Sequence, residues 1–167
     1  MGLDNIPKEY PCGDKATKDS DNRIDCVKTQ EANNCPWKNE KESNPMVKDI
    51  NKTIGIFGTD CWYRGKYGNF LLDILEHKEG DDVRDTYYEH PYSWYGENDN
   101  GLDTDYCFDM AKWMRDNTEK FAYKASKYID TKQLENGSVK DYIDDWSYAI
   151  WWLEFVGKTS NGSAVWW

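Results

Sequence analysis

The segment from Ser138 to Gly157 constrains the fold most, because it has the pattern of a long helix with a wide apolar face. Ser138 and Asp141 have the spacing of a capping box at its start, and Gly157 is predicted to end it. Trp151 and Trp152 widen the face, so we expect this helix to lie centrally, with neighbours on two sides. The residues at the i, i+3, i+4 and i+7 spacing of one helix face are Val139, Tyr142, Ile143, Trp146, Ala149, Ile150 and Leu153.

Three shorter helices are predicted before it. Asn69 is a suitable N-cap for the run "FLLDILEHKE", which Gly80 would end. A second helix is expected from Thr104, and Thr118 is predicted to cap a third. The run "TIGIF" at 53–57 is predicted to be a short strand.

The first 57 residues differ from the rest of the chain, since they are rich in Pro, Asn, Asp and Lys and show little apolar periodicity. Such a composition by itself suggests disorder. Three of the five cysteines lie here, however, each beside an apolar residue or a proline. We therefore predict one α+β domain over 1–167. In it, an irregular, cysteine-stapled N-terminal half (1–57) packs on a mainly helical half (58–167) of three to four helices with an aromatic-rich core.

Aromatic residues make up 16% of the chain, with nine Trp and twelve Tyr. Each such ring buries about 150–250 Å² of surface, so a few rings can replace many aliphatic side chains. Packing of the core is therefore the first interpretation of this excess. The alternative is an aromatic surface that binds a sugar, a base or a partner protein.

Four cysteines, all in the irregular half or at its edge, form a candidate metal site: Cys12, Cys26, Cys35 and Cys61. A metal that closes loops lacking a core contributes folding free energy directly. The four could bind zinc or an iron–sulfur cluster, although the C-x-x-C pair typical of structural zinc is missing. Two disulfides or four unlinked thiols remain alternatives. Cys107 is expected to be a small buried hydrophobe, and His77 and His90 are candidate substitute ligands or ordinary surface histidines.

The stretch "GTDCWYRGKYGN" at 58–69 combines cations, rings and glycines just before a predicted helix N-terminus. Amide groups at such a terminus, together with two cations, can bind an anion, and neighbouring rings can stack on a base. The stretch matches neither a P-loop nor a dinucleotide fingerprint. Alternatively, the cations pair with local carboxylates and the glycines only form a turn. The candidate ligand-binding residues are Arg64, Lys66, Trp62, Tyr63, Tyr67 and Asn69.

The net charge of −10 repels phosphate backbones, so we expect no direct nucleic-acid binding. The N-terminal residues lack the pattern of a signal peptide, and no apolar run of about eighteen residues is present. We therefore expect no membrane association and a cytoplasmic protein. Lys outnumbers Arg by 17 to 4, a bias typical of A+T-rich coding sequences. It would suit a virus or mobile element, and thus host cytoplasm or a virion, but also many cellular genomes.

Three functions are compatible with these features. The first is a non-enzymatic interaction protein that binds protein partners or self-assembles through aromatic surfaces. The second is a protein that binds an anionic, nucleotide-like small molecule at the Trp62–Asn69 turn. The third is a carboxylate-based hydrolase, for which the sequence singles out no catalytic residue.

Overall fold

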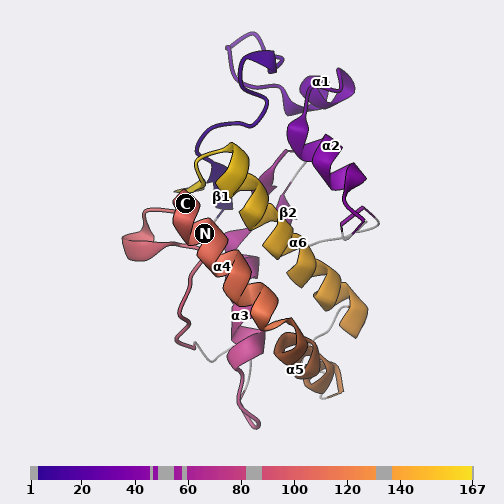
Figure 1. Ribbon diagram of the computed structural model, residues 1–167, viewed down its shortest axis with the longest axis vertical. Helices are drawn as coiled ribbons and strands as arrows, with labels where there is room; N and C mark the ends of the chain where they lie inside the picture. The colour runs from indigo at the N-terminus through magenta and orange to yellow at the C-terminus, as the bar shows by residue number, and fades with distance from the viewer. Residues whose placement is uncertain are drawn as a thin grey trace.

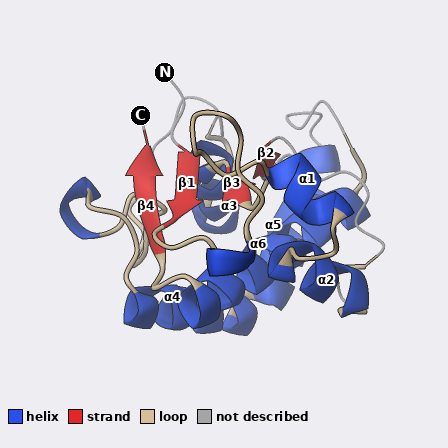
Figure 2. Ribbon diagram, turned by 90° about the horizontal axis from the view of Figure 1, so that it is seen from above, coloured by secondary structure: helices blue, strands red, loops and turns tan. Residues whose placement is uncertain are grey.

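The computed structural model describes residues 4–45, 47–48, 55–57, 60–81, 88–130 and 137–166. A small antiparallel sheet lies on one side of the molecule, and helices α4 and α6 run along the other (Figure 2). This α+β architecture, with an aromatic-rich helical C-terminal half, confirms the predicted fold class. The strands are β1 (Asp4–Pro7), β2 (Ile56–Phe57), β3 (Trp62–Tyr63) and β4 (Ser163–Trp166), in the order β2-β3-β1-β4.

Helix α6 is the centre of the helical half and crosses the molecule diagonally between its neighbours (Figure 1). It packs mainly against α4 and also against α5, while α5 packs on α3. The described helices are α1 (Cys26–Glu31), α2 (Pro36–Ser43), α3 (Gly65–Glu76), α4 (Thr104–Asp116), α5 (Thr118–Asp130) and α6 (Val139–Thr159), with 3-10 turns η1 (Gly13–Lys15) and η2 (Glu97–Asp99). None of these helices combines the length and the apolarity needed to cross a bilayer.

The start of α6 agrees with the sequence pattern, but its end does not. Ser138 and Asp141 form the predicted capping box. Gly157 does not end the helix, which continues to Thr159. Instead it lies buried where α4 crosses α6, and a Cβ at this position would be 3.2 Å from Cys107 and 3.3 Å from Phe108. The missing side chain therefore allows close helix packing.

Helix α3 begins earlier than expected, at Gly65, so the prediction of Asn69 as its N-cap is wrong. The Asn69 Oδ1 atom accepts a hydrogen bond from the backbone N–H of Trp94 at 3.0 Å. The helix ends at Glu76, before Gly80. Thr118 is the first residue of α5 rather than the residue before it, and its hydroxyl donates to the Met114 carbonyl at 3.3 Å.

The core is built largely of rings. Tyr63 of β3 stacks on Trp94 with a centroid distance of 4.1 Å and also contacts Trp152 of α6. A second stack joins Phe121 of α5 to Trp146 of α6, also at 4.1 Å. All five rings are completely buried. Core packing therefore explains the presence of these five aromatic residues.

The N-terminal half contains more regular structure than its composition suggests. It provides β1 to the sheet, and α2 is joined to α6 by a hydrogen bond from Trp37 Nε1 to the Tyr148 hydroxyl at 3.2 Å. From residue 8 to residue 35, however, only Cys12 and Thr29 are buried. This stretch has almost no apolar core of its own.

The predicted strand at 53–57 forms where it is described, and residues 163–166 form a further strand that was not predicted. Residues 163–166 pack back on the protein as β4, which pairs with β1, while Trp167 lies outside the described residues. Ile56 and Phe57 form β2, and residues 53–54 of the predicted strand also lie outside the described part.

Candidate functional site

The four cysteines of the candidate metal site come together around one small cavity of about 10 Å³. They approach it from separate segments: the residue before η1, the first residue of α1, the residue before α2, and the turn before β3. Asp60 and Tyr10 also line the cavity. All four thiols are free. Among the described residues, no three His, Cys, Asp or Glu side chains have the arrangement of a bound metal ion.

In the absence of a nearby cation, the surroundings of this cavity disfavour the thiolate form of its cysteines. Burial, together with the Asp60 carboxylate and the neighbouring sulfurs, raises the pKa of Cys26 to about 12. Burial likewise places the pKa of Cys61 well above its ordinary value, with Cys26 and Asp60 adding to the effect. Without a cation, these thiols stay protonated at neutral pH.

A backbone N–H group already points at one of the sulfurs. Cys35 is the N-cap of α2, and its Sγ atom accepts a hydrogen bond from the Lys38 N–H at 3.5 Å. Burial raises the pKa of Cys12, but the N–H groups of Cys12 and Gly13 act in the opposite direction. N–H donors of this kind stabilise sulfur in its thiolate form.

The remaining cysteine and the two histidines lie away from this cavity. Cys107 is completely buried in the core, as expected for a small hydrophobe. His77 Nε2 lies 2.7 Å from the Asp81 carbonyl oxygen, and His90 Nε2 lies 2.7 Å from Asp73 Oδ1. Neither histidine lines the cysteine cavity, so the candidate substitute ligands are not brought to it.

The six candidate anion-binding residues are divided between the core and the surface. Arg64 and Lys66 are exposed at the start of α3. Tyr63 is completely buried, and Tyr67 donates a 2.5 Å hydrogen bond to the buried Asp145 carboxylate. Asn69 is bonded to the Trp94 backbone, as described above. An anion at this turn could therefore contact the two cations but not the faces of these two tyrosine rings.

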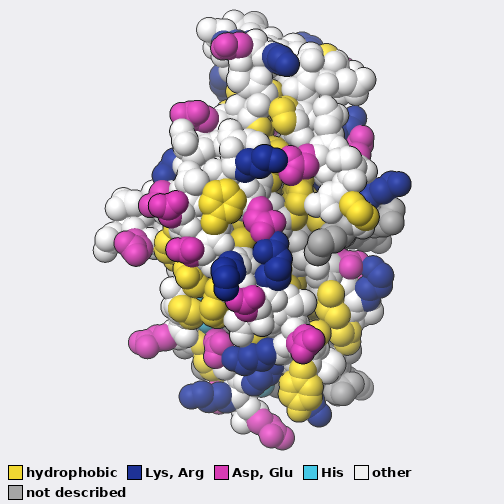
Figure 3. Space-filling view, viewed as in Figure 1, with side chains coloured by type: hydrophobic (Ala, Val, Ile, Leu, Met, Phe, Trp, Pro, Cys, Tyr) yellow, Lys and Arg dark blue, Asp and Glu magenta, His cyan; other side chains and the backbone are white. Residues whose placement is uncertain are grey.

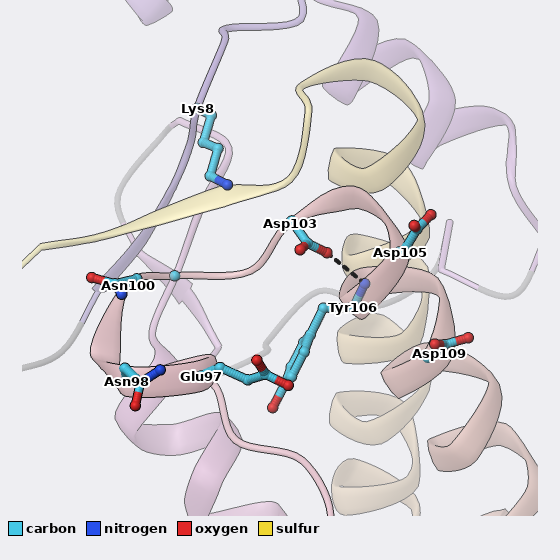
Figure 4. A pocket seen from close by; sticks show the side chains of 9 residues that line it. Lys8, Glu97, Asn98, Asn100, Asp103, Asp105, Tyr106 and Asp109 are labelled. Carbon is cyan, nitrogen blue, oxygen red and sulfur yellow. Dashed lines mark hydrogen bonds between the residues drawn. The ribbon is translucent and has the colours of Figure 1, made fainter.

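A larger cleft of about 440 Å³ lies between the residue after β1, the η2 loop and the first turns of α4 (Figure 4). Its acidic lining residues are Glu97, Asp103, Asp105 and Asp109. Lys8 extends toward the cleft from the strand side. Asp103 is already used as the N-cap of α4, where it accepts from the Tyr106 N–H at 2.8 Å. With four carboxylates and one lysine, the cleft repels anions, so it does not suit a nucleotide-like ligand.

The side of the sheet that faces away from the helices also carries aromatic residues. Tyr63 and Asn5 point toward the helices, since Tyr63 stacks on Trp94 and Asn5 Nδ2 donates to the Trp94 carbonyl. Because side chains alternate along a strand, the neighbouring residues point the other way. We call the residues Asp4, Ile6, Trp62, Ala164 and Trp166 the outer sheet face.

Two tryptophans dominate the outer sheet face. The rings of Trp62 and Trp166 pack edge to face across β1, with centroids 5.7 Å apart. Trp62 Nε1 also donates to the Tyr10 hydroxyl at 2.9 Å, which fixes its ring. Trp166 remains 55% exposed, whereas Trp94, Trp146 and Trp152 are completely buried.

The edge of the sheet at β4 is only partly covered. Ser163 exchanges two backbone hydrogen bonds with Leu102, at 2.9 and 2.8 Å. In an antiparallel strand, Val165 presents its N–H and C=O on the same edge as Ser163. No described backbone group is bonded to Val165 on that edge. The apolar run "SAVWW" at 163–167 is a sequence signal that could have indicated this surface, but its pairing with β1 depends on a distant segment.

Side chains elsewhere on the surface are of mixed charge. The face formed by α4 and α6 shows acidic and basic groups interspersed with small apolar areas (Figure 3). Its ion pairs include Arg115 with Glu154 and Lys112 with Asp116. Among the described residues, the exposed large hydrophobic side chains include only one tryptophan, Trp166 of the outer sheet face.

Comparisons of this chain with protein-family models, with curated proteins and with solved structures found no match.

Proposed function

We propose that this is a non-enzymatic interaction protein that self-associates through the outer sheet face. The observation that carries the proposal is the exposed Trp166, which packs against Trp62 beside the uncovered part of the β4 edge. Tryptophan is enriched among the residues that dominate binding energy at protein interfaces. An uncovered strand edge also offers backbone groups that can pair with another chain.

The net charge of −10 predicts how this association depends on salt. Two copies repel each other electrostatically, while contact between their tryptophans removes apolar surface from water. Salt screens the repulsion, with a Debye length of about 10 Å at 0.1 M and about 3 Å at 1 M. Self-association should therefore strengthen as salt is added. Binding to a basic partner at the acidic cleft would instead weaken.

Sedimentation velocity over a concentration series tests the proposal. The wild-type chain should form a dimer or larger assembly, and Trp166→Ser should weaken the association at least about 30-fold. That factor corresponds to about 2 kcal/mol, the usual threshold for a dominant interface residue. Tyr123→Ser is the matched control, because Tyr123 is an aromatic residue of α5 that is 60% exposed and lies outside the outer sheet face.

Circular dichroism of each variant separates lost association from lost folding. A wild-type chain that remains monomeric at about 100 μM in high salt would contradict self-association, since weaker affinities lie far below those of specific interfaces. Equal weakening by Trp166→Ser and Tyr123→Ser would also contradict the assignment, because it would show that the effect is not confined to this surface.

A further inference from the structure

We propose that Cys12, Cys26, Cys35 and Cys61 bind one zinc ion, which fixes the loops of residues 8–35 and the turn before β3. These residues come from four separate segments, yet their side chains line the same cavity. A chance set of surface thiols would not converge in this way. The zinc centre is independent of the outer sheet face and stands whether or not the chain self-associates.

The packing of this region gives the physical reason for a metal. From residue 8 to residue 35, only Cys12 and Thr29 are buried, so hydrophobic burial contributes little to holding these loops. The segment nevertheless has defined turns, such as the pair of backbone bonds that connect Asp25 to Thr17 and Thr29 to Asp25. A metal that joins the loops can supply the missing stabilisation. The unfolded chain has no such site, so the free energy of metal binding adds to the free energy of folding.

The size of the cavity distinguishes between a single ion and a cluster. A volume of about 10 Å³ is close to the space that one water molecule needs. Before any rearrangement, this space is closer in size to one metal ion than to a cluster of several iron and sulfide atoms. A set of four thiolates around one ion is typical of tetrahedral zinc.

Some rearrangement is needed on binding, since the four sulfurs do not yet have ligand geometry. Rotation of the thiols about χ1 and a small inward movement of the loops would bring them toward the cavity centre. Asp60 is the other acidic group at the cavity, and its Oδ1 atom accepts a hydrogen bond from the Trp62 N–H at 3.2 Å. We assign the four ligand positions to the cysteines, because four thiolates are a typical ligand set of structural zinc.

A bound divalent ion deprotonates its thiol ligands. The Lys38 N–H, which already donates to Cys35 Sγ, then remains as a hydrogen-bonding partner that orients this sulfur.

The test uses the full chain, reduced and loaded with Zn²⁺, and compares Cys35→Ala with Cys107→Ala. Native mass spectrometry should show one zinc per wild-type chain and per Cys107→Ala chain. Cys35→Ala should bind Zn²⁺ at least about 100-fold more weakly, because loss of an outer-shell partner alone costs 10–100-fold. Cys107 is a suitable control, since it is buried in the core away from the cavity.

Two further measurements keep the test independent of folding defects in one variant. Co²⁺ substituted for zinc should give the visible ligand-field and thiolate charge-transfer bands of a tetrahedral thiolate site in the wild type. Cys26→Ala should lose those bands. Hydrogen exchange should show that zinc removal exposes the amides of residues 8–35, while those of α4 and α6 remain protected.

Each alternative occupant has its own signature that would overturn the proposal. Iron with acid-labile sulfide would identify a cluster, and a mass lower by four hydrogens with no metal would identify two disulfides. Four reactive thiols with no Zn²⁺ uptake would show that the cavity is only a packing feature. Equal Zn²⁺ affinity for Cys35→Ala and Cys107→Ala would show that the ion binds elsewhere.

Discussion

The substitution Gly68→Ala tests the packing between α3 and the aromatic core. Gly68 is a buried helical residue, and a Cβ added there would lie 2.4 Å from two atoms of the Trp94 indole and 2.7 Å from a third. In an exposed helix the same change would stabilise the protein by about 1 kcal/mol, because alanine has the higher helix propensity. The two effects have opposite signs, so their magnitudes decide the outcome.

The steric effect should exceed the gain in propensity. Optimal carbon contacts are about 3.5–4.0 Å, so the new methyl group would penetrate the ring by more than about 1 Å. Trp94 is completely buried and stacked on Tyr63 at 4.1 Å, which leaves it no open space into which to move. Overpacking costs about 1–3 kcal/mol, and an overlap of more than about 1 Å with a ring that cannot move places this site in the upper part of that range, at about 2–3 kcal/mol. After the gain in propensity we expect a net loss of about 1–2 kcal/mol, or about 2–8 °C in Tm for a chain of this size.

Urea denaturation followed by circular dichroism measures the free energy of unfolding. Lys66→Ala is the control, because it adds alanine to an exposed position of the same helix and should change stability by less than about 0.5 kcal/mol. In a Trp94→Phe background, the smaller ring should reduce the cost of Gly68→Ala. A Gly68→Ala protein as stable as the wild type would refute the contact between Gly68 and Trp94.

Two further predictions concern a helix cap and a buried histidine. Ser138→Ala should destabilise the protein by about 1 kcal/mol in urea denaturation, because it removes the Ser138 hydroxyl that accepts from the Asp141 N–H in the α6 capping box. Ser126→Ala inside α5 serves as the control. Equal losses of stability from both substitutions would contradict the role of the cap. Burial, with the Lys124 charge adding to it, lowers the pKa of His77 to about 4, so the unfolded chain binds more protons between pH 4 and 6.5. The contribution of His77 to stability is therefore complete above about pH 6.5 and falls as the pH is lowered from 6.5 to 4. His77→Gln should reduce the slope of the unfolding free energy against pH in this window. An unchanged slope would show that other groups cause the pH dependence.

Local patterns in the sequence were sufficient for much of the helical half. The apolar spacing from Val139 to Leu153 requires one buried face, and Ser138 with Asp141 satisfies the first amides within a single turn. Such features depend on residues three or four positions apart, so they can be predicted without knowledge of the fold. The grouping of Cys12, Cys26, Cys35 and Cys61 was also predicted, because sulfur chemistry limits the reasons for cysteines in a segment without a core.

The positions that were predicted incorrectly depend on residues far away in the sequence. Asn69 has the chemistry of an N-cap, but the Trp94 backbone uses its side chain. Gly157 has the chemistry of a helix stop, but the close approach of Cys107 requires its small size inside α6. In both cases a long-range contact determined the role of a residue with a strong local preference.

The sequence by itself determined the amphipathic helices, the aromatic core and the cysteine set, since each follows from side-chain chemistry and short-range spacing. Only the tertiary structure decided which rings are buried and which face the solvent. Tyr63 and Trp62 are adjacent in β3, yet the first is in the core and the second packs with Trp166 on the outer sheet face. The physical reason is that alternation along a strand fixes two opposite sides, while the packing of α6 and Trp94 against the sheet determines which side is buried.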